Sequence, residues 1–134
     1  MGFGVIVFDE SAAPPLKTRE LVEWTHATLK KKVGKLPARL IDAGPKLQLW
    51  LDAMYKTFPN FCGPDAPADL DDESSYGTDY TIRKEVVYAL FASSLEQEAQ
   101  ATSTRYARDF GLSLIMNGKL IRPTGEMIEL IDSF

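Results

Sequence analysis

The sequence contains one thiol and one imidazole, Cys62 and His26. A cysteine activated by a histidine can attack a carbonyl group, provided that the two side chains meet within hydrogen-bond distance. Nothing in the spacing implies that meeting, because His26 falls on a predicted helix and Cys62 in a glycine-flanked loop. We interpret Cys62 as a small apolar filler. No other catalytic signature is present, so we expect no catalytic residues and no enzyme activity.

A second feature that could do chemistry is an irregular stretch at residues 59–79, which contains six acids and no base. These acids are Asp65, Asp69, Asp71, Asp72, Glu73 and Asp79. Their carboxylates could ligate a hard cation, but they lack the EF-hand pattern of alternating ligands, central glycine and terminal glutamate. A single cysteine also excludes a zinc site built on several thiolates. We expect no metal and no cofactor. A small metal-dependent hydrolase that uses these acids stays an alternative.

Nucleotide and nucleic-acid binding are disfavoured by the pattern of glycines and by the charge. The sequence Gly2-Phe3-Gly4 precedes a predicted strand, whereas a dinucleotide-binding fingerprint follows one. The chain has 15 basic and 19 acidic residues, a formal charge of −4. A general nucleic-acid binder needs a net basic face that releases counterions. We therefore expect no nucleic-acid partner.

Charge is distributed unevenly along the chain. Residues 17–46 contain eight bases and three acids, a net charge of +5, and residues 52–79 contain one base and seven acids, a net charge of −6. If the two surfaces stay apart, each can steer a charged partner toward the protein. If they fold together, they neutralise each other.

The spacing of apolar residues and turn formers predicts the elements that must position these groups. Asn117-Gly118 is the strongest hairpin signal, because a type I′ turn needs positive φ at both positions. Thr124 can cap a last helix with the apolar stripe Met127, Leu130, Ile131 and Phe134. In chain order we expect a strand at 3–8, helices at 16–33 and between Pro45 and Pro59, a strand at 82–91 (or a helix), a helix between Ser94 and Gly111, strands at 112–116 and 120–121, and the last helix.

The order of these elements predicts one domain over residues 1–134. We expect an α+β or α/β sandwich, with a single mixed sheet of about four strands covered by about four helices. The segment 82–116 would form a right-handed crossover if its two strands lie parallel in that sheet. The 134 residues and 45% apolar content are typical of one globular domain.

The location of the protein is predicted from what the sequence lacks. No stretch approaches the roughly 18 apolar residues that a membrane-spanning helix needs. The first apolar stretch, 3–8, is short, follows no basic region and ends in two acids, unlike a signal peptide. With one free thiol, a reducing cytoplasm is the expected compartment, and no membrane partner is expected.

Several short motifs resemble a family of small, largely uncharacterised bacterial proteins. The resemblance spans about residues 5–116, and the chain departs from the family in lacking a tryptophan in the second buried strand and in adding a C-terminal helix. The motifs that carry it are Val7-Phe8-Asp9, Ala12-Ala13-Pro14, Phe58-Pro59, Gly63-Pro64-Asp65-Ala66, Asp79-Tyr80-Thr81-Ile82, Val87-Tyr88, Phe91, Ser94, Glu98-Ala99 and Phe110-Gly111.

That family is associated with toxin-immunity proteins, which accompany secreted or contact-delivered bacterial toxins. The resemblance implies a cytoplasmic protein that neutralises one toxin domain by direct protein–protein binding. The acidic residues of 65–79 could occupy the basic, phosphate-binding cleft of a nuclease-like toxin, because charge steering and desolvated charge pairs give fast, tight association. A homo-oligomeric structural module, with the C-terminal stripe as the contact of a homodimer, is a further alternative.

Overall fold

The computed structural model describes residues 2–12, 18–30, 40–60 and 76–129. These residues form one open sheet in the order β2-β3-β1-β4-β5-β6, in which every neighbouring pair is antiparallel. The strands are β1 (Gly2–Phe8), β2 (Asp79–Ile82), β3 (Val86–Ala92), β4 (Ser113–Met116), β5 (Lys119–Ile121) and β6 (Met127–Glu129). The α-helices are α1 (Thr18–Lys30), α2 (Pro45–Tyr55) and α3 (Glu96–Asp109), and short 3-10 helices occupy Glu10–Ala12, Leu40–Asp42 and Ser93–Leu95.

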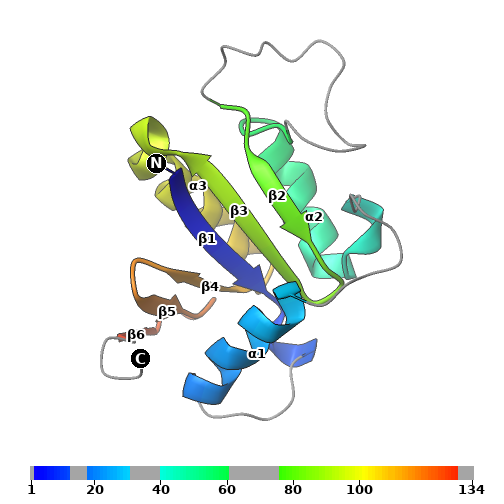
Figure 1. The fold of residues 1–134 in the computed structure, drawn as a ribbon, viewed down its shortest axis with the longest axis vertical. Coiled ribbons are helices and arrows are strands. Elements are labelled where there is room, and N and C mark those ends of the chain that lie inside the picture. Colours follow the sequence, from blue (N-terminus) through cyan, green and yellow to red (C-terminus); the bar gives the residue numbers. More distant parts are fainter. Residues whose placement is uncertain (1, 13–17, 31–39, 61–75, 130–134) are drawn as a thin grey trace.

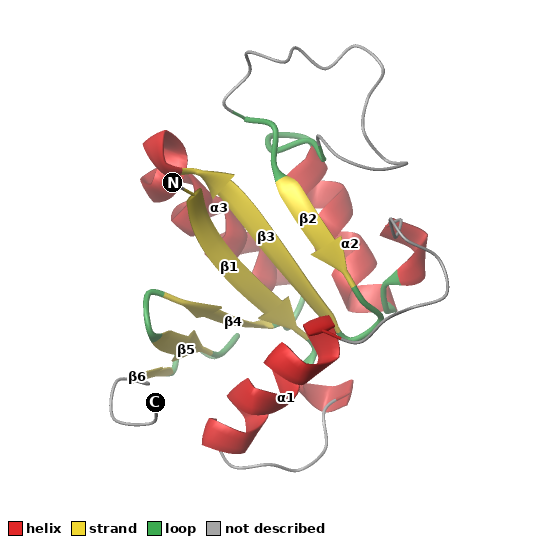
Figure 2. Cartoon of the chain, in the orientation of Figure 1, coloured by secondary structure: helices red, strands yellow, loops and turns green. Residues whose placement is uncertain are grey.

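The helices lie on both faces of the sheet, so there are two hydrophobic cores. Figure 1 shows α2 and α3 side by side behind the sheet, whereas α1 crosses in front of one end only. The larger core lies between the sheet and the pair α2 and α3, and the smaller core lies beneath α1. The cartoon in Figure 2 shows the same arrangement by element type. Among the described helices, α1 alone lies on this face, and it covers only one end of it.

Strand β1 is central and buried on both faces, as its continuous apolar sequence predicts. Phe3, Val5 and Val7 belong to the larger core, and Ile6 and Phe8 to the smaller one. Side chains alternate between the two faces of a strand, so a strand between two layers needs apolar residues at consecutive positions.

Helices α2 and α3 pack through a large residue against small ones. Trp50 of α2 is fully buried, and its indole nitrogen donates a hydrogen bond to the carbonyl of Ser103, 3.2 Å away. Ala99, Ser103 and Ala107 are the buried residues of α3 and recur every four positions. Residues four apart lie on one face of a helix, so this face offers little side-chain volume and lets α2 approach closely.

The sheet differs from the prediction in type and in size. We expected a mixed sheet of about four strands and about four helices, but the described residues form six antiparallel strands and three α-helices. The strand predicted at 82–91 is confirmed at 86–91, which belongs to β3, whereas Ile82 ends the preceding strand β2, and the two strands form a hairpin. Its turn is closed by a hydrogen bond of 2.9 Å from the Arg83 amide to the Val86 carbonyl. The chain therefore reverses direction near Lys84, between the end of β2 and the start of β3.

The predicted last helix is wrong where the structure describes it. Met127–Glu129 is the strand β6, which pairs with β5. The reversal that starts β6 uses Gly125 at φ 95°, and the Arg122 amide donates to the Glu126 carbonyl at 2.8 Å. Positive φ is available to glycine at little cost, so the chain turns back onto β5. Met127, the first residue of the predicted stripe, therefore lies on a strand, and Leu130, Ile131 and Phe134 lie outside the described residues.

The predicted Asn117-Gly118 hairpin is confirmed, and the strands on either side of the predicted crossover 82–116 are parallel. Asn117 and Gly118 have φ values of 52° and 69°, as a type I′ turn requires, and they join β4 to β5. Strands β3 and β4 are each antiparallel to β1, so they run parallel to each other. They are not neighbours, because β1 lies between them, and α3 connects them across β1.

Candidate functional site

Most of the acids predicted to bind a partner fall outside the described residues. Asp65, Asp69, Asp71, Asp72 and Glu73 lie in the segment 61–75, as does Cys62. Of the predicted set the structure places Asp79, which is half-exposed at the first position of β2. The site is therefore described from Asp79 and from the two points at which the chain enters and leaves the segment 61–75.

These two points lie next to each other. The Thr78 amide donates a hydrogen bond of 2.9 Å to the Pro59 carbonyl, and Asn60 and Thr78 form a parallel β-bridge. Asn60 and Thr78 are both buried. The Thr78 hydroxyl also donates to the Tyr76 carbonyl at 2.9 Å. Both ends of the segment that contains the acids are thus fixed at the same end of the sheet, beside Asp79.

Tyr76 and Tyr80 fix the return of the chain through their rings and hydroxyls. The Tyr76 ring packs against Phe58 at 5.6 Å between ring centres, and its hydroxyl donates to a carboxylate oxygen of Glu98 at 2.9 Å. This hydrogen bond to a carboxylate raises the pKa of Tyr76. Tyr80 is buried and donates to the Phe58 carbonyl at 2.8 Å. Residues on either side of the segment 61–75 therefore meet at Phe58.

Asp79 stands on the part of the sheet that α1 leaves uncovered. In the register of the sheet Asp79 lies beside Leu90, and Leu90 lies beside Gly4. Tyr88 and Thr81 form the next pair along the same face. We call this surface the open face and define it by its members, which are Asp79, Thr81, Tyr88, Leu90, Gly2 and Gly4.

The glycines of β1 let side chains of β3 lie flat across the open face. A methyl group added at Gly4 would meet the Tyr88 hydroxyl at 2.4 Å, and one added at Gly2 would meet the Leu90 side chain at 2.6 Å. Leu90 remains 36% exposed, although it is a large apolar residue in the middle of a sheet. The open face therefore combines a half-exposed ring, an exposed leucine and a carboxylate.

The carboxylate of Asp79 forms no ion pair with a base of the described residues. Among the described side chains, no lysine or arginine nitrogen lies within 4.0 Å of it. Two described bases of the positive region 17–46 pair with other acids: Arg19 with Glu23 at 3.5 Å, and Lys46 with Asp9 at 3.8 Å.

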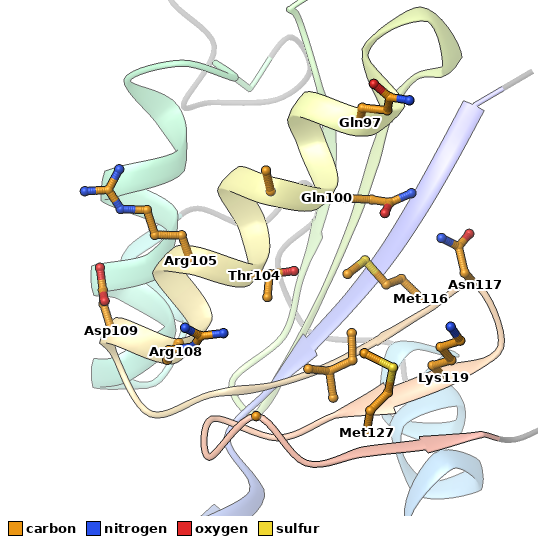
Figure 3. A pocket seen from close by; sticks show the side chains of 13 residues that line it. Gln97, Gln100, Thr104, Arg105, Arg108, Asp109, Met116, Asn117, Lys119 and Met127 are labelled. Carbon is orange, nitrogen blue, oxygen red and sulfur yellow. The ribbon is translucent and has the colours of Figure 1, made fainter.

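A second surface, which the sequence analysis missed, is a groove on the other face of the sheet. It has a volume of about 580 Å³ and lies between α3 and the end of the sheet formed by β4, β5 and β6. Figure 3 shows residues of α3 on one side and of the β4–β5 hairpin on the other. Its residues come from Gln97–Asp109, Met116–Ile121 and Gly125–Met127. A polar helix face at 97, 100, 104 and 108 was the only sequence signal for it.

The described residues bring no catalytic or metal-binding cluster together. His26 is exposed on α1. Within the part of the chain that the structure describes, no three side chains of His, Cys, Asp or Glu could hold a metal ion. The arrangement that the structure does show is two surfaces of opposite charge character on opposite faces of one sheet.

A scan of family models and searches of curated proteins and solved structures found no significant match to this chain. None of the helices in residues 2–12, 18–30, 40–60 and 76–129 is long and apolar enough to cross a bilayer.

Proposed function

We propose that this chain is an immunity-type binding protein that neutralises a bacterial toxin domain in the cytoplasm by direct contact. The observation that supports this most is the position of Asp79. Its carboxylate has no described base within 4.0 Å, and it lies on the open face beside the two fixed ends of the segment 61–75. That segment contains five further acids.

A toxin domain with a basic cleft is the partner that this surface would recognise. Clefts that bind phosphate groups are lined with lysine and arginine, and acids that enter such a cleft replace the substrate's negative charges. Complementary charge raises the association rate, and pairs that lose water on binding slow dissociation. An inhibitor of this kind needs no catalytic group of its own.

The apolar part of the open face can supply binding energy beside these charges. Tyrosine is enriched among the residues that dominate interface energies, and a partly exposed leucine beside it adds apolar area. Tyr88 and Leu90 occupy these roles on β3, next to Asp79. We expect the carboxylates to steer the toxin and the two apolar side chains to hold it.

The test starts with the gene beside this one. If its product has a toxin domain, the two proteins are expressed together, and their affinity is measured by calorimetry at low and high salt. We expect a one-to-one complex that weakens strongly as salt rises, because exposed charges are screened. Reversal of charge in Asp79→Lys should weaken binding by about tenfold or more.

The matched control for that variant is Asp52→Lys, which changes an exposed acid on α2, behind the sheet. It alters the net charge equally and should leave affinity within about twofold. A double variant, Asp71→Lys with Asp72→Lys, tests the segment 61–75. If this double variant protects cells as well as the parent does, the assignment of the acids to the interface is wrong.

A further inference from the structure

The layer of helices behind the sheet ends before the sheet does. α2 and α3 cover the strands from β2 to β4, whereas β5 and β6 extend beyond α3, and no helix of the described residues lies against them (Figure 1). Lys119 and Ile121 lie two positions apart on β5, and Met127 of β6 is paired with Ile121. All three residues line the groove. The groove is the space beside α3 above these residues.

The dimensions of this space match one further helix. Neighbouring strands are about 4.8 Å apart, so β5 and β6 together present a strip about 10 Å wide, which is about the diameter of an α-helix. The α3 wall from Gln97 to Arg108 is about 16 Å long at a rise of about 1.5 Å per residue. A helix of about three turns would therefore fill the groove and complete the layer.

The floor of the groove is apolar. It consists of Met116 and Ile121 with Met127, which is 55% exposed. Methionine is flexible and polarisable, and it is common on surfaces that adapt to a partner's side chains. Apolar residues at i, i+3, i+4 and i+7 of a docked helix would bury this floor, in the way that amphipathic helices bind hydrophobic grooves.

The sides of the groove are cationic. In Figure 3, Arg108 from α3 and Lys119 from β5 lie on opposite sides of the floor, with Met127 between them. Neither has a carboxylate of a described residue within 4.0 Å. Arg105 adds a third positive charge at the rim and Asp109 one negative charge, so the groove is net positive. A helix with acidic flanks would complement it.

From this geometry we propose that the groove binds an acidic amphipathic helix of a partner protein. The apolar stripe of that helix packs on Met116, Ile121 and Met127, and its flanking carboxylates pair with Arg108 and Lys119. The groove lies on the face opposite to the open face and has the opposite charge. It can therefore be occupied together with the open face, and the proposal does not depend on the proposed toxin contact.

The test uses a defined probe and the full chain. The probe is a fluorescent peptide of about 14 residues with leucines at helical spacing and glutamates on both flanks. A matched probe carries lysines in place of the glutamates. Binding is followed by fluorescence anisotropy, and the site is located from amide shifts of the isotope-labelled protein. We expect the acidic probe to shift residues 97–108, 116–121 and 127, and the lysine probe to shift none of them.

Variants then separate the two features of the groove. Arg108→Glu and Lys119→Glu should each weaken binding of the acidic probe by about fivefold or more, and the neutral change Met127→Asn should weaken binding without changing its salt dependence. The control is Lys84→Glu, an equal change of charge at an exposed residue of the β2–β3 turn, on the other edge of the sheet. It should leave probe affinity within about twofold.

Two results would overturn the proposal. One is the absence of shifts at the groove up to about 1 mM acidic probe, or equal binding of both probes. The other is a concentration-dependent dimer in light scattering that Arg108→Glu dissociates, because the groove would then hold a second copy of this chain. Loss of toxin binding in the open-face variants would not affect either result, so the two proposals fail separately.

Discussion

The guanidinium Nε of Arg122 lies 3.1 Å from a carboxylate oxygen of Glu10, a residue 112 positions earlier in the sequence. The same oxygen accepts a hydrogen bond of 3.0 Å from the Ser113 hydroxyl, and a terminal nitrogen of Arg122 donates to Glu126 at 2.7 Å. The hydrogen bonds to Glu126 and Glu10 raise the pKa of Arg122. The turn that leads into β6 is thereby attached to the residues that follow β1, and the floor of the groove is held in place.

Replacing Arg122 should loosen β6 more than the rest of the sheet. In Arg122→Met both ion pairs are lost, and the cost in unfolding free energy should be about 1 kcal/mol or less, because the side chain is partly exposed. Hydrogen exchange should become faster in residues 119–129 and stay unchanged in β1 and β3. Arg105→Met is the control. Uniform acceleration across the whole sheet would show that the ion pairs do not act locally.

Tyr80 should make the protein sensitive to alkali. Burial, followed by the nearby Tyr55, raises the pKa of Tyr80 well above its usual value. A group with a raised folded-state pKa contributes stability that is present below its unfolded pKa of about 10 and is lost as pH rises toward the folded value. We expect the denaturant midpoint to fall above about pH 10. In Tyr80→Phe this alkaline fall should become smaller.

The same variant should be less stable at neutral pH. Removal of the Tyr80 hydroxyl leaves the Phe58 carbonyl without that donor, which should cost about 1–3 kcal/mol. Urea denaturation of both proteins between pH 7 and pH 11 measures both effects at once. Parallel curves for parent and variant over this range would contradict the assignment of the alkaline effect to Tyr80.

Gly4 should tolerate no side chain while Tyr88 lies across it. A methyl group in Gly4→Ala would come within 2.4 Å of the Tyr88 hydroxyl, so the ring must swing away. We expect a loss of about 1–3 kcal/mol, as for other overpacked sites. Tyr88→Ala removes the obstacle, and the double variant should lose less than the sum of the two single variants. Additive losses would show that the two residues do not compete for the same space.

Leu90 and Phe91 are neighbours on β3 that should separate binding from stability. Leu90 is 36% exposed on the open face, whereas Phe91 is 1% exposed in the larger core. Leu90→Glu should change unfolding free energy by about 0.5 kcal/mol and weaken toxin binding. Phe91→Ala should cost about 3–5 kcal/mol. If Leu90→Glu keeps full toxin affinity, the open face is not part of the interface.

The sequence by itself determined the local elements. The continuous apolar run of β1, the stripe of α2 between its prolines, and the Asn117-Gly118 turn each follow from side-chain periodicity or from backbone preference over a few residues. The apolar, β-branched run in the strand predicted at 82–91 likewise indicated β3, which spans Val86–Ala92. These signals are short-range, so they can be found without knowing what packs against them.

Tertiary structure alone decided how the sheet ends and where its surfaces lie. Met127 and Ile128 fit a helix or a strand equally well, and the pairing with β5, together with the Arg122–Glu10 contact, selects the strand. The groove needs α3 and β4 to β6 side by side, and the open face needs α1 to cover only one end of the sheet. Both depend on contacts between residues far apart in the chain, which no local pattern encodes.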